Sequence, residues 1–232
     1  MWHVTSQKYG ISALGLQRVL GLASYQTAWA WLHKLRRAMV RPVRERLQGE
    51  VELDETYVGG KEAHVVGRQT NKKSIVVIAA EIRGRATGRI RMGPVADVSG
   101  DSLVPFVQAV VSPGAVVRTD GWPGYNGIGK AGYDHRSTNI SASGDPAHIV
   151  MPRVHRVAAL VDRWWLGTHQ GAISAKHLEY YLDEYTFRFN RRRSRARGML
   201  FYRLLEQSVQ ADPVPYKCLV NGTDTDTANP NM

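Results

Sequence analysis

A short apolar segment at residues 75–80, Ile-Val-Val-Ile-Ala-Ala, constrains the fold of this chain more than any other feature. It is the longest uninterrupted apolar stretch, and its six residues have the length of a strand rather than the roughly 20 that cross a bilayer. Its β-branched residues favour a strand that is buried on both faces. A strand of this kind needs helices packed over the sheet that contains it.

The segments around this strand follow an order that predicts a mixed sheet. Residues 50–54 (Glu-Val-Glu-Leu-Asp) alternate in the manner of a strand, and residues 83–88 are typical of a turn that leads into a hairpin strand at 89–93. The remaining predicted elements are a helix at 101–111, a strand at 115–120, and helices at 154–166, 174–187 and 199–209. This order predicts an α/β domain whose mixed sheet is covered by helices.

Two helices are predicted before the sheet. The first lies between Ser12, a suitable N-cap, and Gly21, a suitable C-cap, and the second occupies residues 24–39. The expected apolar face of the second helix consists of Ala28, Trp31, Leu32, Leu35 and Met39. A short break and a basic end carrying Arg36 and Arg37 make the pair similar to a helix-turn-helix that contacts DNA. An ordinary helical hairpin packed on the next domain is the alternative.

Charge and cysteine content narrow the class of protein. The chain has 31 Lys and Arg against 20 Asp and Glu, a net charge of +11, which indicates a polyanionic partner such as nucleic acid; a basic enzyme with no such partner is the alternative. A single cysteine, Cys218, excludes an internal disulfide framework and a Cys-based zinc site within this chain. These features and the absence of a signal pattern predict a cytoplasmic protein.

Two aspartates mark a candidate metal site. Asp54 and Asp120 each lie at the C-terminal end of an apolar strand, and ligands in open α/β sheets bind at such strand ends. Carboxylates brought together there repel one another unless a cation or a proton separates them. Oxygen ligands suit Mg²⁺ or Mn²⁺, and two such ions about 4 Å apart serve phosphodiester chemistry. The alternative is that both aspartates cap turns.

The residues around these aspartates resemble a known family. Val-Glu-Leu-Asp-Glu-Thr-Tyr-Val-Gly-Gly-Lys at 51–61 and Val-Arg-Thr-Asp-Gly-Trp-Pro-Gly-Tyr at 117–125 look like the first two acidic motifs of DDE-superfamily insertion-sequence transposases, specifically the ISXO-two-like family. Residues 167–171 and 177–192 are similar to its C-terminal signature. The resemblance runs from about residue 2 to about residue 218. It implies an RNase-H-like fold and DNA strand transfer that depends on Mg²⁺ or Mn²⁺.

The third metal ligand is where the chain departs from this family. The family places Glu or Asn about 35 residues after the second Asp, and Lys seven residues further on. The corresponding residues here are His155 and Asp162. His155 is a possible metal or water ligand. Because seven helical residues turn about 700°, Asp162 shares its face and is the alternative third ligand; otherwise its charge repels DNA phosphate.

A run of arginines predicts a DNA-binding surface. Six arginines lie within ten residues: Arg188, Arg191, Arg192, Arg193, Arg195 and Arg197. Arginines bind phosphate oxygens without regard to sequence.

The predicted domains are a helix-turn-helix-like segment at 1–48, an RNase-H-like catalytic domain at 49–198, and a C-terminal helix with a disordered tail at 199–232. The partner is expected to be double-stranded DNA, bound by a homo-oligomer associated with the nucleoid.

Two functions from different classes remain open at this point. The first is a transposase that cuts element ends and joins the 3′-hydroxyl to target DNA, with Asp54, Asp120 and His155 or Asp162 at its centre. The second is a catalytically inactive remnant that only binds DNA. The family usually carries a Cys-rich zinc ribbon ahead of the helix pair. Its absence here predicts a truncated gene or a start codon assigned too late.

Overall fold

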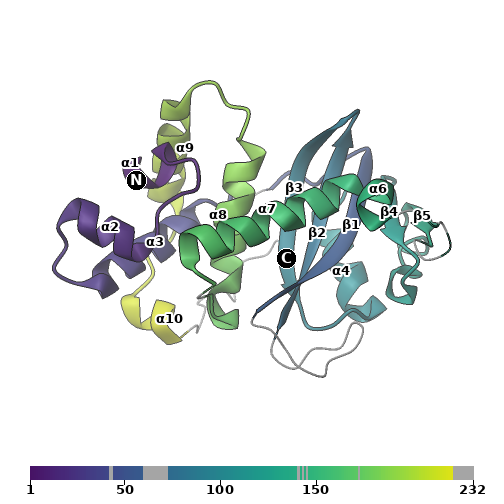
Figure 1. Cartoon of the computed structure of the whole chain (residues 1–232), viewed down its shortest axis with the longest axis horizontal. Coiled ribbons are helices and arrows are strands. Elements are labelled where there is room, and N and C mark those ends of the chain that lie inside the picture. Colours follow the sequence, from purple (N-terminus) through teal and green to yellow (C-terminus); the bar gives the residue numbers. More distant parts are fainter. Residues whose placement is uncertain are drawn as a thin grey trace. The chain divides into compact units, whose positions relative to one another are not determined.

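Five strands form one mixed sheet in the order β3-β2-β1-β4-β5, shown in the computed structural model in Figure 1. The strands are β1 (Glu50–Val58), β2 (Ser74–Arg83), β3 (Ala86–Val95), β4 (Val116–Asp120) and β5 (Asp134–Thr138). β2 pairs antiparallel with β1 and β3, while β4 pairs parallel with β1 and β5. With helices packed on this sheet, the chain has the α/β architecture that its sequence predicts and the RNase-H-like fold that the family resemblance implies.

The structure describes residues 1–41, 44–59, 73–139, 142, 144, 146–171 and 173–221. Gly60 and Lys61, which end the first acidic motif, lie outside these residues, as does the predicted tail from residue 222. The described helices are α1 (Trp2–Ser6), α2 (Ala13–Leu20), α3 (Tyr25–Ala38), α4 (Gly100–Val110), η1 (Pro123–Tyr125), α6 (Ala147–Val150), α7 (Pro152–His169), η2 (Ala175–His177), α8 (Leu178–Asn190), α9 (Arg197–Gln210) and α10 (Tyr216–Asn221).

By packing, the chain divides into two units. Glu45–Arg163 forms the sheet unit, and Met1–Arg44 joins the segment from Trp164 onward to form the helical unit. This division differs from the expected segments 1–48, 49–198 and 199–232, because α8 and α9 pack against the N-terminal helix α3.

The core of the sheet unit follows from strand alternation. Val51 and Leu53 of β1 pack in one apolar cluster with Leu103 and Val107 of α4. Glu52, which points to the opposite face, is bound to the first turn of α7. Residues 75–80 of β2 are all buried, which confirms the predicted two-sided strand. The sheet therefore has α4 on one face and the first half of α7 on the other.

The helical unit confirms the predicted caps of its first long helix. The Ser12 hydroxyl accepts a hydrogen bond from the Gly15 N–H at 3.1 Å, and Gly21 ends α2 with a φ of 62°. In α3, Ala28 and Leu32 are buried as predicted, but Trp31 is 46% exposed, so its place on the apolar face was wrong. The buried face of α3 turns instead toward Arg36, which is 2% exposed.

Candidate active site

The parallel pairing of β1 and β4 aligns the two predicted aspartates. Glu50, Val51 and Glu52 pair with residues 116, 117 and 118, a constant offset of 66. The pairing ends at Glu52, and the same offset continued two residues further matches Asp54 to Asp120. Asp120 is the last residue of β4, as predicted. Asp54 does not end its strand, because β1 continues to pair with β2 as far as Val58.

The turn after β4 holds Asp120 in place. Its Oδ1 accepts a hydrogen bond from the Trp122 N–H at 3.1 Å, and the Trp122 indole donates to the Val98 carbonyl at 2.8 Å. Gly124 is required for this close packing, since a Cβ there would lie 2.3 Å from the same carbonyl oxygen. The motif at 117–125 therefore builds a tight turn that fixes the carboxylate.

His155 of α7 reaches the first aspartate. Its Nε2 lies 3.6 Å from Asp54 Oδ2 and is buried without a hydrogen-bond partner among the described residues. Burial lowers the pKa of His155, the charge of His148 lowers it further, and the charge of Asp120 opposes both. The imidazole is therefore neutral near pH 7, and neutral imidazole is the form that ligates metals.

Tyr125 and Glu55 form a second contact beside these groups. The buried Tyr125 hydroxyl donates a hydrogen bond to Glu55 Oε2 at 2.5 Å. Burial raises the pKa of Tyr125 well above its usual value, and the charges of Glu55, Asp54 and Asp120 add to this effect. Both aspartates thus act on one hydroxyl group, which supports their convergence. Sequence reasoning did not single out Tyr125 or Glu55, although each lies within a quoted acidic motif.

Glu52 was also missed, because it reads as an ordinary polar position of an alternating strand. Its carboxylate is 1% exposed and accepts hydrogen bonds from the N–H groups of Arg153 and Val154 at 2.6 and 3.0 Å. Burial raises the pKa of Glu52, while these two bonds and the charge of Arg153 act in the opposite direction. Period-two alternation with Asp54 is the signal that could have identified it.

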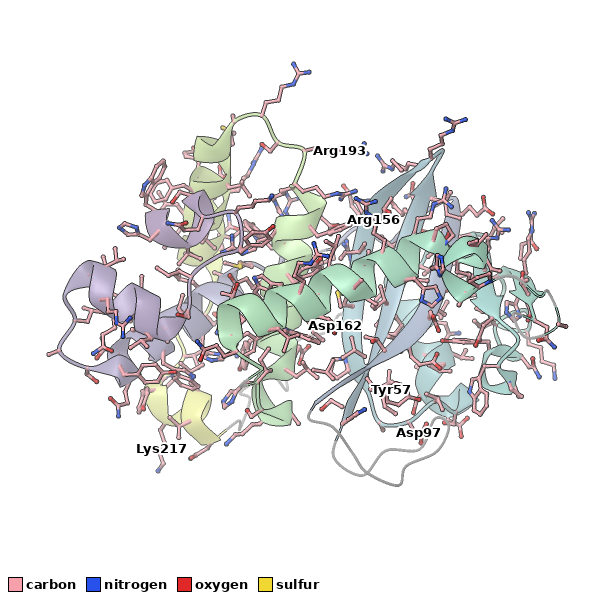
Figure 2. All side chains as sticks on the ribbon, in the orientation of Figure 1. Tyr57, Asp97, Arg156, Asp162, Arg193 and Lys217 are labelled. Carbon is pink, nitrogen blue, oxygen red and sulfur yellow. The ribbon has the colours of Figure 1, made fainter. Side chains whose placement is uncertain are left out.

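Asp162, the alternative third ligand, is exposed further along α7. Seven residues of helix span about 10 Å, so Asp162 lies roughly that far along the axis from His155. Because His155 is the residue that reaches Asp54, the helix geometry favours His155 over Asp162. Figure 2 shows Asp162 and Arg156 on different sides of α7.

The donor set suits a hard divalent cation. Two carboxylates and a neutral imidazole match the ligand preferences of Mn²⁺ and Mg²⁺, and the unpartnered Nε2 of His155 is an available donor. Among the described residues, however, no three His, Cys, Asp or Glu side chains are arranged closely enough to hold a metal ion. The convergence of Asp54, Asp120 and His155 is therefore incomplete as a coordination shell.

Six of the eight predicted DNA-binding arginines fall into three groups. Arg36 and Arg188 are bound to the buried Glu184, at 2.8 and 2.7 Å, so their guanidinium groups stabilise the helical unit and do not fit the expected contact with DNA. Arg191 and Arg192, just after α8, stack over the rings of Phe187 and Phe189 of that helix, with 4.0 and 3.8 Å from the guanidinium carbon to the ring centroid.

The third group is exposed. Arg193 and Arg195 lie in the segment between α8 and α9, where Figure 2 labels Arg193. Arg37 is half-buried at the end of α3, and the side chain of Arg197 lies outside the described residues. Arg193 and Arg195 are therefore the arginines of the run best placed to meet phosphate.

Residues 46–190, which are 145 of the 232 residues, match the family model of the ISXO2-like transposase domain. No curated protein matches the chain significantly. The helices of the described part include none with the length and apolar character needed to cross a membrane.

Proposed function

Because the chain belongs to the ISXO2-like transposase family, we propose that it cuts DNA at the ends of an insertion sequence and joins the freed 3′-hydroxyl to target DNA. The observation that carries this proposal is the grouping of Asp54, Asp120 and His155 where β1, β4 and α7 meet. These three residues would hold Mg²⁺ or Mn²⁺. When bound, the cation supplies Lewis acidity at the scissile phosphate and lowers the pKa of the attacking hydroxyl.

The chain's own residues then have distinct roles. Asp54 and Asp120 provide negative charge on the sheet, and the turn at Trp122 fixes the second of these carboxylates. Tyr125 orients Glu55 through a hydrogen bond. The neutral His155 adds a nitrogen donor without adding a third negative charge that would repel DNA. Arg193 and Arg195 would bind phosphate groups independently of sequence.

The experiment is a joining assay with Mn²⁺ and DNA carrying the element's terminal repeats. Asp54→Asn, Asp120→Asn and His155→Ala are each expected to abolish joining while leaving DNA binding in place. Asp134→Asn is the matched control, because Asp134 is an exposed carboxylate of the same unit that pairs with Arg136. Full joining by either aspartate variant would refute the proposed site.

A second candidate is a protein that binds DNA without joining it. Two observations favour it: the described residues hold no closed three-ligand cluster, and Asp162 stands where the family places Lys. DNA binding by the wild type with no joining under any metal condition would establish this alternative.

A further inference from the structure

The first turn of α7 obtains its hydrogen-bond acceptor from a distant strand. The first backbone N–H groups of a helix have no partner within the helix, and a side chain just before it usually accepts their bonds. Here the residue before the helix is Met151, which has no such acceptor, and Pro152 has no N–H to donate. The N–H groups of Arg153 and Val154 both donate to Glu52 Oε2.

A second contact fastens the same helix end to the sheet. The Arg153 guanidinium lies 3.4 Å from Glu52 Oε1 through Nη1 and donates to the Gly84 carbonyl at 2.7 Å through Nη2. A carboxylate at a helix N-terminus also interacts favourably with the helix dipole. With Glu52 only 1% exposed, water does not replace these bonds.

The spacing of strand and helix links this anchor to the candidate active site. Glu52 and Asp54 are two residues apart on β1, so their side chains lie on the same face, about 7 Å apart along the strand. On α7, the residue after the anchored Val154 is His155, whose Nε2 lies 3.6 Å from Asp54 Oδ2. The contacts of Glu52 with Arg153 and Val154 thus fix both the distance of α7 from the sheet and its rotation about its own axis where His155 lies near Asp54.

We infer that Glu52 is a positioning residue, whose bonds to the start of α7 hold the His155 imidazole beside Asp54. It acts through the helix and not on the reacting atoms. The inference rests on the proposed function, because the position of His155 affects activity only if His155 takes part in the proposed reaction. Residues that orient metal ligands typically change activity 10- to 100-fold when they are replaced.

Two substitutions at Glu52 distinguish the effect of its side-chain length from the effect of its negative charge. Glu52→Gln removes the charge but keeps an oxygen at the same distance, which can accept both backbone N–H bonds. Glu52→Asp keeps the charge but withdraws it by one methylene group, so the bonds to α7 are lost. A positioning role therefore predicts that Glu52→Gln retains function and Glu52→Asp does not. Direct participation in the reaction or in metal binding predicts the reverse order.

Glu81→Gln is the matched control. Glu81 is a buried carboxylate of the neighbouring strand β2, 2% exposed, and it binds Arg83, Arg89 and the Gln48 N–H rather than α7. It reports the effect of removing a buried negative charge from the same unit. Thermal unfolding of all three variants shows whether the unit remains folded.

The first measurement needs neither metal nor DNA. Ring nitrogen NMR of His155, assigned with His155→Gln, reports the surroundings of its imidazole, and hydrogen exchange reports the protection of the Arg153 and Val154 amides. We expect Glu52→Asp to shift the His155 signals and to increase exchange at both amides at least tenfold. Glu52→Gln and Glu81→Gln should leave the signals and the exchange rates close to wild type.

The second measurement is Mn²⁺-dependent joining. Glu52→Asp is expected to lose 10- to 100-fold, and Glu52→Gln less than about threefold. An unshifted His155 in Glu52→Asp, or loss of joining in Glu52→Gln as complete as in Asp54→Asn, would overturn the inference. If the wild type does not join DNA, the proposed function fails, and the NMR and exchange results still decide whether Glu52 positions His155.

Discussion

Both units connect distant parts of the chain through buried side chains, and the sheet unit adds strand pairing. In the sheet unit, backbone pairing links all five strands, and an apolar cluster containing Leu53, Val77 and Leu103 packs against the sheet. In the helical unit, segments more than 100 residues apart are joined by side chains. An apolar cluster contains both Leu32 and Phe187. Polar contacts add to it: Arg36 binds Glu184 at 2.8 Å, and the Trp164 indole donates to the Tyr9 carbonyl at 2.7 Å. The helical unit therefore depends more on individual side chains.

The difference has an electrostatic side as well. Glu184 lies fully inside the helical unit between Arg36 and Arg188, whose charges hold its pKa at about 2 although burial alone would raise it. In the sheet unit, the carboxylates of Asp54 and Asp120 lie around the candidate active site instead. Buried carboxylates thus stabilise packing in both units, as Glu52 and Glu81 do in the sheet unit, and the sheet unit also carries the carboxylates of the candidate active site.

The largest expected effect is at Glu184. Glu184→Gln keeps the shape of the side chain but leaves the buried Arg36 and the half-buried Arg188 without their counter-charge. Breaking a buried ion pair in this way costs about 3–5 kcal/mol of unfolding free energy. Urea unfolding followed by tryptophan fluorescence measures it, because five of the six tryptophans lie in the helical unit.

The control for this substitution is Glu206→Gln. Glu206 forms an exposed ion pair with Arg203 on α9, and such pairs contribute about 0–1 kcal/mol. A change of less than about 1 kcal/mol in Glu184→Gln would show that the buried triad does not distinguish the helical unit from the sheet unit.

The second-largest expected effect is a decrease in the unfolding free energy of the helical unit at acid pH. Burial, followed by the charges of Arg36 and His177, lowers the pKa of His33 to about 2, against the opposing charge of Glu184. Burial and Arg36 lower the pKa of His169 to about 4. Both folded pKa values lie below the unfolded value of 6.5, so the unfolded state takes up protons more readily. The unfolding free energy is therefore at its full value above pH 6.5 and decreases as the pH falls below 6.5. From pH 7 to pH 5 each histidine should cost about 2 kcal/mol.

Unfolding curves at pH 7 and pH 5 test this dependence. His33→Gln should remove about half of the loss, and His148→Gln, which changes an exposed histidine of the sheet unit, should leave it unchanged. A helical unit equally stable at both pH values would contradict the neutral, buried state of these histidines.

The sequence predicts what is local and misses what is distant. The caps of α2 and the strand at 75–80 were identified because their signals lie within a few residues. Arg36 was assigned to DNA because it reads as the basic end of a helix, while its partner Glu184 lies 148 residues away. The strand β5, Asp-His-Arg-Ser-Thr, was missed because a short and mostly exposed edge strand lacks an apolar pattern.

The candidate active site shows the same limit. Asp54 and Asp120 were predicted from their strands, and His155 from the resemblance to the family, which places a ligand at that distance from the second aspartate. The length of β1 beyond Asp54 comes from its pairing with β2, which the sequence of β1 alone does not contain. The bond from Glu52 to α7 joins residues 102 apart, so no local pattern predicts it.

Asp162→Lys tests whether the charge at this position of α7 affects only DNA binding or also affects joining. The substitution changes the charge by two units at an exposed position. A solvent-screened charge contact is worth about 1 kcal/mol at 4 Å, so DNA binding should tighten by roughly fivefold. Joining should persist, because Asp162 lies about 10 Å along the helix from His155.

Asp134→Lys makes the same charge change on the exposed strand β5 and controls for a general electrostatic gain. Tighter DNA binding combined with loss of joining in Asp162→Lys would move the third ligand from His155 to Asp162.

The smallest effect on stability is expected for Arg193→Gln combined with Arg195→Gln. Both side chains are exposed, unlike Arg36, so the unfolding free energy should change by less than about 0.5 kcal/mol. DNA binding should weaken for all sequences alike, and the slope of log affinity against log salt should fall by about 1.8, or 0.9 for each lost phosphate contact. Arg136→Gln, at an exposed arginine of the sheet unit that pairs with Asp134, is the control. An unchanged slope would show that these arginines face away from DNA, and the stacked Arg191 and Arg192 would then be the next to test. A large loss of stability would instead mean that the helical unit uses even its exposed arginines for folding, which would remove the distinction between its buried and its exposed charges.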